Sequence, residues 1–215
     1  MAKTVAPLLS FDAGGQIAKT QVYSRWKGRP YVRRYVVPAN PNTAAQQETR
    51  STFAWLQNVW KFFPAGATGA WELYANGFRI TGRNAFAKVN LPPLRGKTDL
   101  TGFVFSPSAA AGIIATGVTV TPGSEALQVT LGAPVLPTGW TITSAWAACI
   151  AQQDPSSGEL YVVTAGSDES TPYEVDLTGL TAAQPYVVGA WFEYKKPDGS
   201  PAYGQSLMTT GTPTA

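Results

Sequence analysis

The sequence of 215 residues contains no histidine, a single cysteine (Cys149) and two methionines. Histidine is the side chain most often used as a catalytic base and as a metal ligand in proteins. Its absence excludes Ser-His-Asp and Cys-His nucleophile systems, together with the usual ligand sets of zinc sites. One cysteine cannot form a disulfide within the chain. We therefore expect no enzymatic activity, no bound metal and no cofactor.

Long hydrophobic runs are also missing. The longest run, around residues 109–115, is too short to cross a bilayer, and residues 1–9 (MAKTVAPLL) lack the apolar segment of a secretory signal. We expect a soluble protein that is made in the cytoplasm and contacts no membrane. With 44% hydrophobic and 12% aromatic residues the chain can bury a core, while 21 glycines and 17 prolines favour many short elements.

The net charge of +3 conceals an uneven distribution along the chain. Residues 1–100 carry 14 Lys and Arg against 4 acids, which gives +10, whereas residues 101–215 carry 2 against 9, which gives −7. A reversal of this size predicts two domains with different surroundings. The opposite charges also allow one copy to pack head-to-tail against another copy, or against a charged partner.

The basic half begins with two predicted strands within residues 15–37. They are joined by the sequence WKGRP, whose glycine and proline suit a hairpin turn. Alternation along the return strand places Tyr31 and Arg33 on one face and Arg34 on the other. An isolated two-stranded ribbon is only marginally stable in water, so we expect this one to lie against another surface.

Helices are predicted after the ribbon. The first begins after Thr43, because Thr43 and Gln46 have the spacing of a capping box. Apolar side chains, Trp55 and Trp60 among them, cover about half of its circumference, which is wider than a lone surface helix needs. A second, shorter helix is predicted around residues 71–78. The two prolines in LPPLRGK then predict the end of regular structure.

From about residue 115 the pattern is that of an all-β domain. Seven short runs separated by turns that contain Gly or Pro predict a sandwich of two antiparallel sheets. Leu177, Leu180 and Tyr186 have the spacing of a tyrosine corner, so this part resembles a fibronectin type III or immunoglobulin-like module. Cys149 falls in the middle of a predicted strand, where we expect a buried and unreactive thiol.

The predicted fold class is therefore α+β, with an N-terminal β-hairpin and helices followed by an all-β immunoglobulin-like sandwich. Four parts are predicted: an N-terminal arm (1–14), a basic hairpin-and-helix docking domain (15–97), a linker (98–114) and an acidic immunoglobulin- or fibronectin III-like β-sandwich (115–215).

Candidate contact residues come from the basic, aromatic ribbon and from the wide apolar face of the first helix. The residues that we expect to touch a partner are Trp26, Arg29, Arg33, Arg34, Trp55 and Trp60. Cations beside aromatic rings could also bind nucleic acid through phosphate contacts and base stacking, although no known nucleic-acid motif accompanies them. Alternatively, the long cations lie over their own aromatic rings.

Two further alternatives concern the predicted sandwich. Calcium could bind its loop acids, which lack the usual alternate spacing of carboxylate ligands: Asp154, Glu159, Asp168 and Glu169. A carbohydrate could stack on an exposed indole. The tryptophans available for this are Trp140, Trp146 and Trp191, of which the last two fall within alternating strands and are expected in the core.

Two motifs in the N-terminal half connect the chain to a family. The first, W-K-G-x-x-Y-x-R, is formed by Trp26, Lys27, Gly28, Tyr31 and Arg33. The second, N-P-x-T-x-x-Q-x-x-x-R-x-x-F, is formed by Asn40, Pro41, Thr43, Gln46, Arg50 and Phe53. With these motifs, and with ITGRNAFAKVN at residues 80–90, the chain resembles a group of largely uncharacterised phage and prophage proteins.

This resemblance implies a non-enzymatic structural protein of the virion, synthesised in the host cytoplasm. Head decoration, or cement, is the role that we expect first. A tail, baseplate or fibre-anchoring component is the alternative, and a nucleic-acid-binding accessory protein follows. The implied partners are other virion proteins, of the capsid or the tail, and further copies of the chain itself, in a homo-oligomer or a multicopy assembly.

Overall fold

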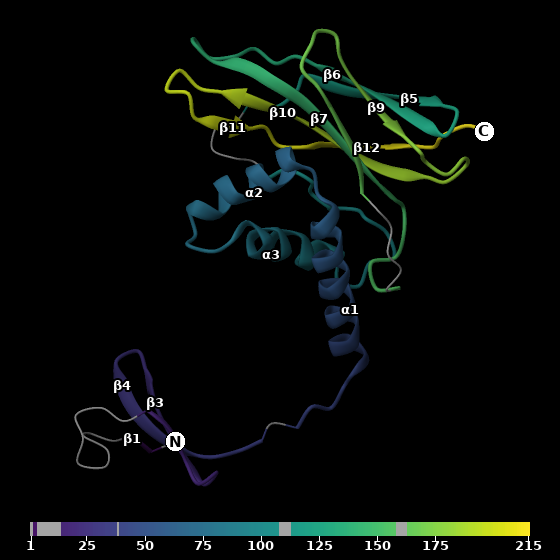
Figure 1. The fold of residues 1–215 in the computed structure, drawn as a ribbon. Helices are drawn as coiled ribbons and strands as arrows, with labels where there is room; N and C mark the ends of the chain where they lie inside the picture. The colour runs from purple at the N-terminus through teal and green to yellow at the C-terminus, as the bar shows by residue number, and fades with distance from the viewer. Residues whose placement is uncertain (1, 4–13, 38, 108–112, 158–162) are drawn as a thin grey trace. The chain divides into compact units, whose positions relative to one another are not determined.

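The computed structural model describes residues 2–3, 14–37, 39–107, 113–157 and 163–215 (Figure 1). The chain divides into two compact units, Met1–Asn42 (unit 1) and Thr43–Ala215 (unit 2). The division falls directly after the predicted ribbon. The predicted boundary at residues 98–114 is therefore wrong, because the helices belong to the same unit as the β-sandwich that follows them.

Unit 1 is a small antiparallel sheet whose strands lie in the order β1-β4-β3-β2. The strands are β1 (Ala2–Lys3), β2 (Gly15–Ile17), β3 (Gln21–Trp26) and β4 (Arg29–Arg34). A two-residue turn, Lys27–Gly28, joins β3 to β4, and both of its residues have positive φ (48° and 76°). This is the geometry of a type I′ turn, for which glycine is favoured, and it confirms the predicted hairpin.

The first predicted strand of the ribbon is divided in the structure. Ala18 and Lys19 both have positive φ and turn the chain between β2 and β3, so that β2 folds back on β3. The alternation that suggested one continuous strand is therefore interrupted by a turn. The ribbon gains a third strand on one side and the short β1 on the other.

Unit 2 begins with helices, of which the first was predicted to start after Thr43 and the second to lie around residues 71–78. They are α1 (Ala44–Val59), continued by a 3-10 turn (Trp60–Phe62), then α2 (Ala65–Asn76) and α3 (Gly82–Leu94). Thr43 is the N-cap of α1, as predicted, but its side chain makes no capping hydrogen bond. Pro92 and Pro93 lie inside α3, where they were predicted to end regular structure. Both stand in the last turn, and because proline has no N–H to donate to the carbonyl four residues earlier, the helix ends one residue after Pro93.

The strands of unit 2 form two antiparallel sheets. The smaller sheet has the order β5-β6-β9, and the larger has the order β11-β10-β7-β8, with β12 also paired to β10. The strands are β5 (Gly117–Gly123), β6 (Ala126–Gly132), β7 (Thr141–Ala151), β8 (Thr164–Asp168), β9 (Tyr173–Thr178), β10 (Tyr186–Lys195), β11 (Pro201–Tyr203) and β12 (Leu207–Gly211). The last of the seven predicted runs, residues 203–209, thus contains parts of two strands, and most of the fourth, residues 159–165, lies outside the described residues.

The two faces of the larger sheet contact different layers. Along β7 and β10, one set of alternate residues packs against the smaller sheet, and Cys149 and Phe192 belong to this set. The other set, which includes Ile150 and Trp191, packs against the helices. Figure 1 shows the helices gathered on one side of this sheet. With both faces covered, β7 and β10 are almost continuously buried, which is why their sequences are so apolar.

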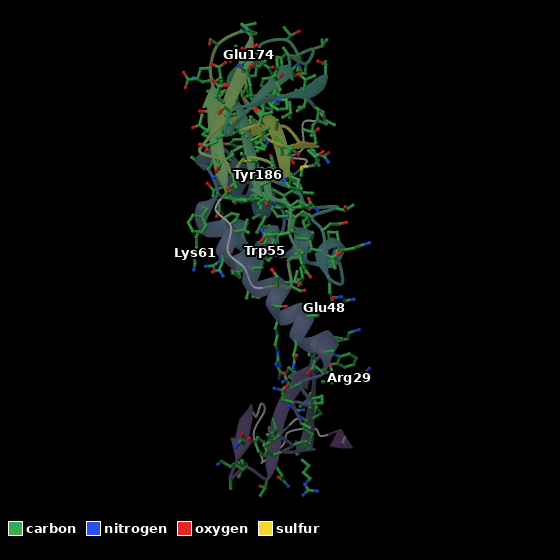
Figure 2. All side chains as sticks on the ribbon, turned by 90° about the vertical axis from the view of Figure 1, so that its right-hand side faces the viewer. Arg29, Glu48, Trp55, Lys61, Glu174 and Tyr186 are labelled. Atoms are coloured by element: carbon green, nitrogen blue, oxygen red, sulfur yellow. The ribbon has the colours of Figure 1, made fainter. Side chains whose placement is uncertain are left out.

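The tyrosine corner predicted before β10 is confirmed. The Tyr186 hydroxyl oxygen accepts a hydrogen bond from the backbone N–H of Thr181 at 3.0 Å, and Leu177 and Leu180 are buried. This bond fixes the connection between the two sheets, because it ties the loop that leaves β9 to the first residue of β10. Figure 2 labels Tyr186 at this position.

The segment predicted as a linker is part of the core. Leu100, Phe103 and Phe105 are buried between the helices and the larger sheet. The Phe105 ring stacks on Trp191 of β10, with centroids 6.3 Å apart. Residues 108–112 of the predicted linker lie outside the described residues. Burial of these aromatic side chains joins the helices to the sandwich as one unit.

Polar side chains satisfy the backbone of this buried segment. The Asn90 amide of α3 donates to the Val104 carbonyl at 3.2 Å, and its oxygen accepts from the Val104 N–H at 2.7 Å. The Trp71 indole of α2 donates to the Phe105 carbonyl at 2.7 Å. In the loop before β12, the Ser206 hydroxyl accepts a hydrogen bond from the Ser106 N–H and donates one to the Ser106 carbonyl, both at 3.2 Å. These contacts pair the backbone groups of Val104, Phe105 and Ser106 where the chain is irregular.

Candidate docking surface

The pairing of β3 with β4 determines which side chains share a face of the unit 1 sheet. Trp26 lies opposite Arg29, and Arg33 lies opposite Val22. Because alternate residues of a strand point to the same side, Trp26, Arg29, Tyr31 and Arg33 lie on one face, which we call the docking face. Arg34 is on the opposite face, so the structure separates it from the other predicted contact residues of the ribbon.

The docking face is exposed and basic. Trp26 is 67% exposed, and Arg29 and Arg33 are both exposed. The Lys27 ammonium lies 4.9 Å from the centre of the Trp26 ring, which agrees with the expectation that cations cover their own aromatic side chains. Residues 1–42 carry seven Lys and Arg against one acid, a net charge of +6. Figure 2 labels Arg29 on this sheet.

Unit 1 has no core of its own in the described part. None of residues 14–37 and 39–42 is buried. Sheets normally become stable by covering one apolar face, and a sheet this small buries little surface on folding. Large apolar side chains are also exposed on unit 1, which is typical of a surface that binds a partner. They are Trp26, Ile17, Val36 and Val37.

Trp55 and Trp60 do not belong to the docking surface, and the prediction that Trp55 contacts a partner is corrected. Trp55 is only 2% exposed and meets Phe103 edge-on at 5.9 Å. Trp60 is half-buried and lies 5.5 Å from the Phe86 ring. Trp55, Leu56 and Val59 of the wide apolar face of α1 are buried in the core of unit 2, whereas Phe53 and Phe62 remain exposed.

One member of the docking face was not among the predicted contact residues. Tyr31 lies between Arg29 and Arg33 on β4, at the alternate position that places it on the same face. The signal that identifies it is the alternation within the strand, which already grouped Tyr31 with Arg33. Its ring supplies apolar area between two guanidinium groups.

The loop acids proposed as calcium ligands have another role. Asp154 and Asp168 each accept hydrogen bonds from the backbone N–H and hydroxyl of the serine two residues later. Such bonds stabilise turns. The described residues contain no group of three or more acidic, cysteine or histidine side chains that could hold a metal. Glu159 lies outside the described residues.

The remaining candidates are mostly buried. Burial raises the pKa of the Cys149 thiol to about 12, so it stays protonated near neutral pH, as expected of an unreactive core thiol. Trp191 is fully buried and cannot stack on a carbohydrate. The half-buried Trp146 donates its indole N–H to the Glu193 carboxylate at 3.0 Å. Trp140 is half-buried beside Tyr194, with ring centroids 6.3 Å apart.

Ionisation of Tyr203 is predicted to lower the stability of the fold at alkaline pH. Burial and the adjacent Glu193 carboxylate raise its pKa to about 12, and its hydroxyl lies 3.3 Å from that carboxylate. A phenol that holds its proton more tightly in the folded state stabilises the fold fully below about pH 10. This stabilisation is lost between about pH 10 and pH 12. When the folded protein is titrated with base and followed by tyrosinate absorbance, Tyr203→Phe should lack one tyrosine ionisation near pH 12. The same number of ionisations near that pH in the wild type and the variant would contradict this.

No family model matches the chain, and no curated protein matches it. Solved structures similar to part of the chain include a computationally redesigned β-sandwich protein (17% identity, TM-score 0.34), which aligns over 47% of this chain and 90% of its own. A structure described as a myokine aligns over 50% and 99% (16% identity, TM-score 0.32). The fourth fibronectin type III domain of a human protein aligns over 48% and 78% (18% identity, TM-score 0.32).

The structure neighbours are thus β-sandwich and fibronectin type III domains, and each covers about half of this chain. The α+β description itself rests on the three helices and the antiparallel sheets observed in the described residues. Within the same residues, no helix has both the length and the apolar character needed to cross a membrane.

Proposed function

We propose that the chain is a non-enzymatic structural protein of a phage particle that attaches through its docking face. The observation that carries this proposal is the unit 1 sheet, which is basic, exposes Trp26 and buries none of its described residues. Such a sheet gains stability when a partner covers it. The two motifs at residues 26–33 and 40–53, which resemble those of phage proteins, favour virion proteins as that partner.

Head decoration, or cement, is the role that we place first. In this role the docking face joins the chain to its neighbours on the head, which are the capsid protein or further copies of the chain, and unit 2 is the stable folded part of each copy. We further propose that the two sheets of unit 2 form a fibronectin type III-like module, which the tyrosine corner at Tyr186 supports. The chain would be synthesised in the host cytoplasm, enter the virion in many copies and need no cofactor.

Quantitative peptide mass spectrometry of purified particles tests this proposal, with heads and tails analysed separately. We expect the protein on heads, in a copy number comparable with that of the capsid protein. A small number of copies found only on tails would favour the alternative of a tail, baseplate or fibre-anchoring component. Absence from both fractions would contradict a structural role in the virion.

Rebinding to particles that lack the protein examines the docking face itself. The full chain with Trp26→Ser and Arg29→Glu should rebind much more weakly than the wild type, because both the apolar anchor and the charge are lost. Arg34→Glu is the matched control, since it changes a charge on the opposite face of the same sheet. Equal rebinding of all three proteins would exclude attachment through the docking face.

Nucleic-acid binding is the second candidate, and the observation that favours it is the same row of Arg and aromatic side chains. It predicts DNA affinity that falls steeply with salt, because each neutralised phosphate releases counterions. Affinity that is absent at low salt, or constant across salt concentrations, would exclude this function. The same titration on Arg29→Glu would show whether the docking face is responsible.

A further inference from the structure

The smaller sheet of unit 2 has an outer face that carries acids and no cations. Glu174 and Asp176 are exposed at alternate positions of β9, and the register places them beside Thr130 and Gln128 of β6. No Lys or Arg occurs between Lys97 and Lys195, so every charged side chain in that interval is acidic. Figure 2 labels Glu174, whose strand belongs to the sheet that the helices do not cover.

Two further acids extend this face at one end. Asp168 accepts a hydrogen bond from the Glu174 backbone N–H at 3.0 Å, which holds its carboxylate beside β9, and the exposed Glu169 follows it in the chain. Hydrogen bonds from the N–H groups of Glu174 and Ser170 lower the pKa of Asp168, so that it is charged at neutral pH. We call the surface formed by Asp168, Glu169, Glu174 and Asp176 the acidic face.

The docking face and the acidic face complement each other. One presents Arg29 and Arg33 around Tyr31 on a sheet that buries none of its described residues, and the other presents carboxylates on the flat outer surface of a sheet. The two arginines are four residues apart on β4, about 14 Å, and Glu174 and Asp176 are two residues apart on β9, about 7 Å. Paired guanidinium and carboxylate groups form strong bidentate hydrogen bonds.

We propose that the docking face of one copy binds the acidic face of a second copy of the chain. This inference rests on the proposed function, because it identifies a second copy of the chain as a partner of the docking face. The contact joins two different surfaces, so a pair of bound copies still offers one free face of each kind. Repetition therefore closes rings or builds chains of subunits, as a multicopy coat requires.

Charge exchange between the two faces tests the contact in the full chain. Sedimentation velocity over a range of protein and salt concentrations should show wild-type association that weakens as salt rises. Arg29→Glu/Arg33→Glu makes both faces acidic, and Glu174→Lys/Asp176→Lys makes both basic. Each variant alone should associate with a dissociation constant about tenfold higher or more. An equimolar mixture of the two should recover association, because each variant complements the other.

Two controls separate the effect of the docking face from a general effect of charge and from unfolding. Arg34→Glu/Lys61→Glu carries the same charge change as the first variant at positions outside the docking face, and it should associate like the wild type. Circular dichroism of each variant verifies that it is folded. A wild type that stays monomeric at low salt and high concentration would overturn the inference. A mixture of the two variants that does not recover association would also overturn it, because charges that meet between two copies are complementary again in the mixture.

The result is separable from the test of the proposed function. A chain found on heads by mass spectrometry that never self-associates would retain its virion role, with another capsid protein as the partner of the docking face. A chain that self-associates through the two faces but is absent from particles would retain the contact and lose the virion role.

Discussion

Replacement of Asn90 by alanine is expected to lower the free energy of unfolding by about 3 kcal/mol. Asn90 is fully buried on α3, and its amide donates to the carbonyls of Phe86 and Val104 and accepts from the Val104 N–H. Alanine removes these bonds and leaves the N–H and carbonyl of the half-buried Val104 without them. The cost of two unpaired backbone groups, together with a small cavity, exceeds the net value of an ordinary hydrogen bond.

Urea denaturation followed by tryptophan fluorescence measures this loss, because several tryptophans are buried in unit 2. Asn84→Ala is the matched control: Asn84 lies on the same helix but is exposed, and its replacement should change the free energy by less than about 0.5 kcal/mol. Similar midpoints for Asn90→Ala and Asn84→Ala would contradict the assigned role of Asn90.

Gly189→Ala is the second substitution expected to have a large effect, with a loss of about 2–3 kcal/mol. Gly189 lies in the middle of β10 on the side that faces the helices. A methyl group there would overlap the Phe105 ring. That ring cannot move aside easily, because Phe103 meets it edge-on at 4.9 Å and Trp191 stacks on it at 6.3 Å. The surrounding layers must therefore shift, which strains a closely packed core.

The same denaturation experiment tests this prediction. Gly117→Ala is the control, because Gly117 also lies in a strand but a methyl group there meets nothing within 4 Å. Truncation of the obstructing ring should make the new methyl tolerable, so the effects of Gly189→Ala and Phe105→Leu should be less than additive by about 1 kcal/mol or more. Strict additivity in the double variant would show that the Phe105 ring is not what limits the space at Gly189.

The two substitutions address the same feature of the fold, the contacts that residues 103–105 make after α3 with the helices and the larger sheet. Gly189 leaves the space that Phe105 occupies, and Asn90 pairs with the backbone of the residue before it. Loss of either contact loosens the attachment of the helices to the larger sheet. Both variants should therefore affect the whole of unit 2 in one transition rather than release the helices separately.

The sequence by itself determined the local features of this protein. The turn at Gly28, the helix start after Thr43, the tyrosine corner at Tyr186 and the buried thiol of Cys149 all follow from residues close together in the chain. Their physical causes are local as well: a positive φ, a capping position and the alternation of a strand. The basic character of the docking face was readable for the same reason.

Only the tertiary structure decided where the units divide and which aromatic side chains remain exposed. Residues 98–107 belong to the segment predicted as a linker (98–114), yet their phenylalanines fill the space between the helices and the larger sheet. Burial of Trp55 depends on that same segment, through Phe103. The free energy of these contacts comes from residues distant in sequence, so no local pattern in the chain carries it.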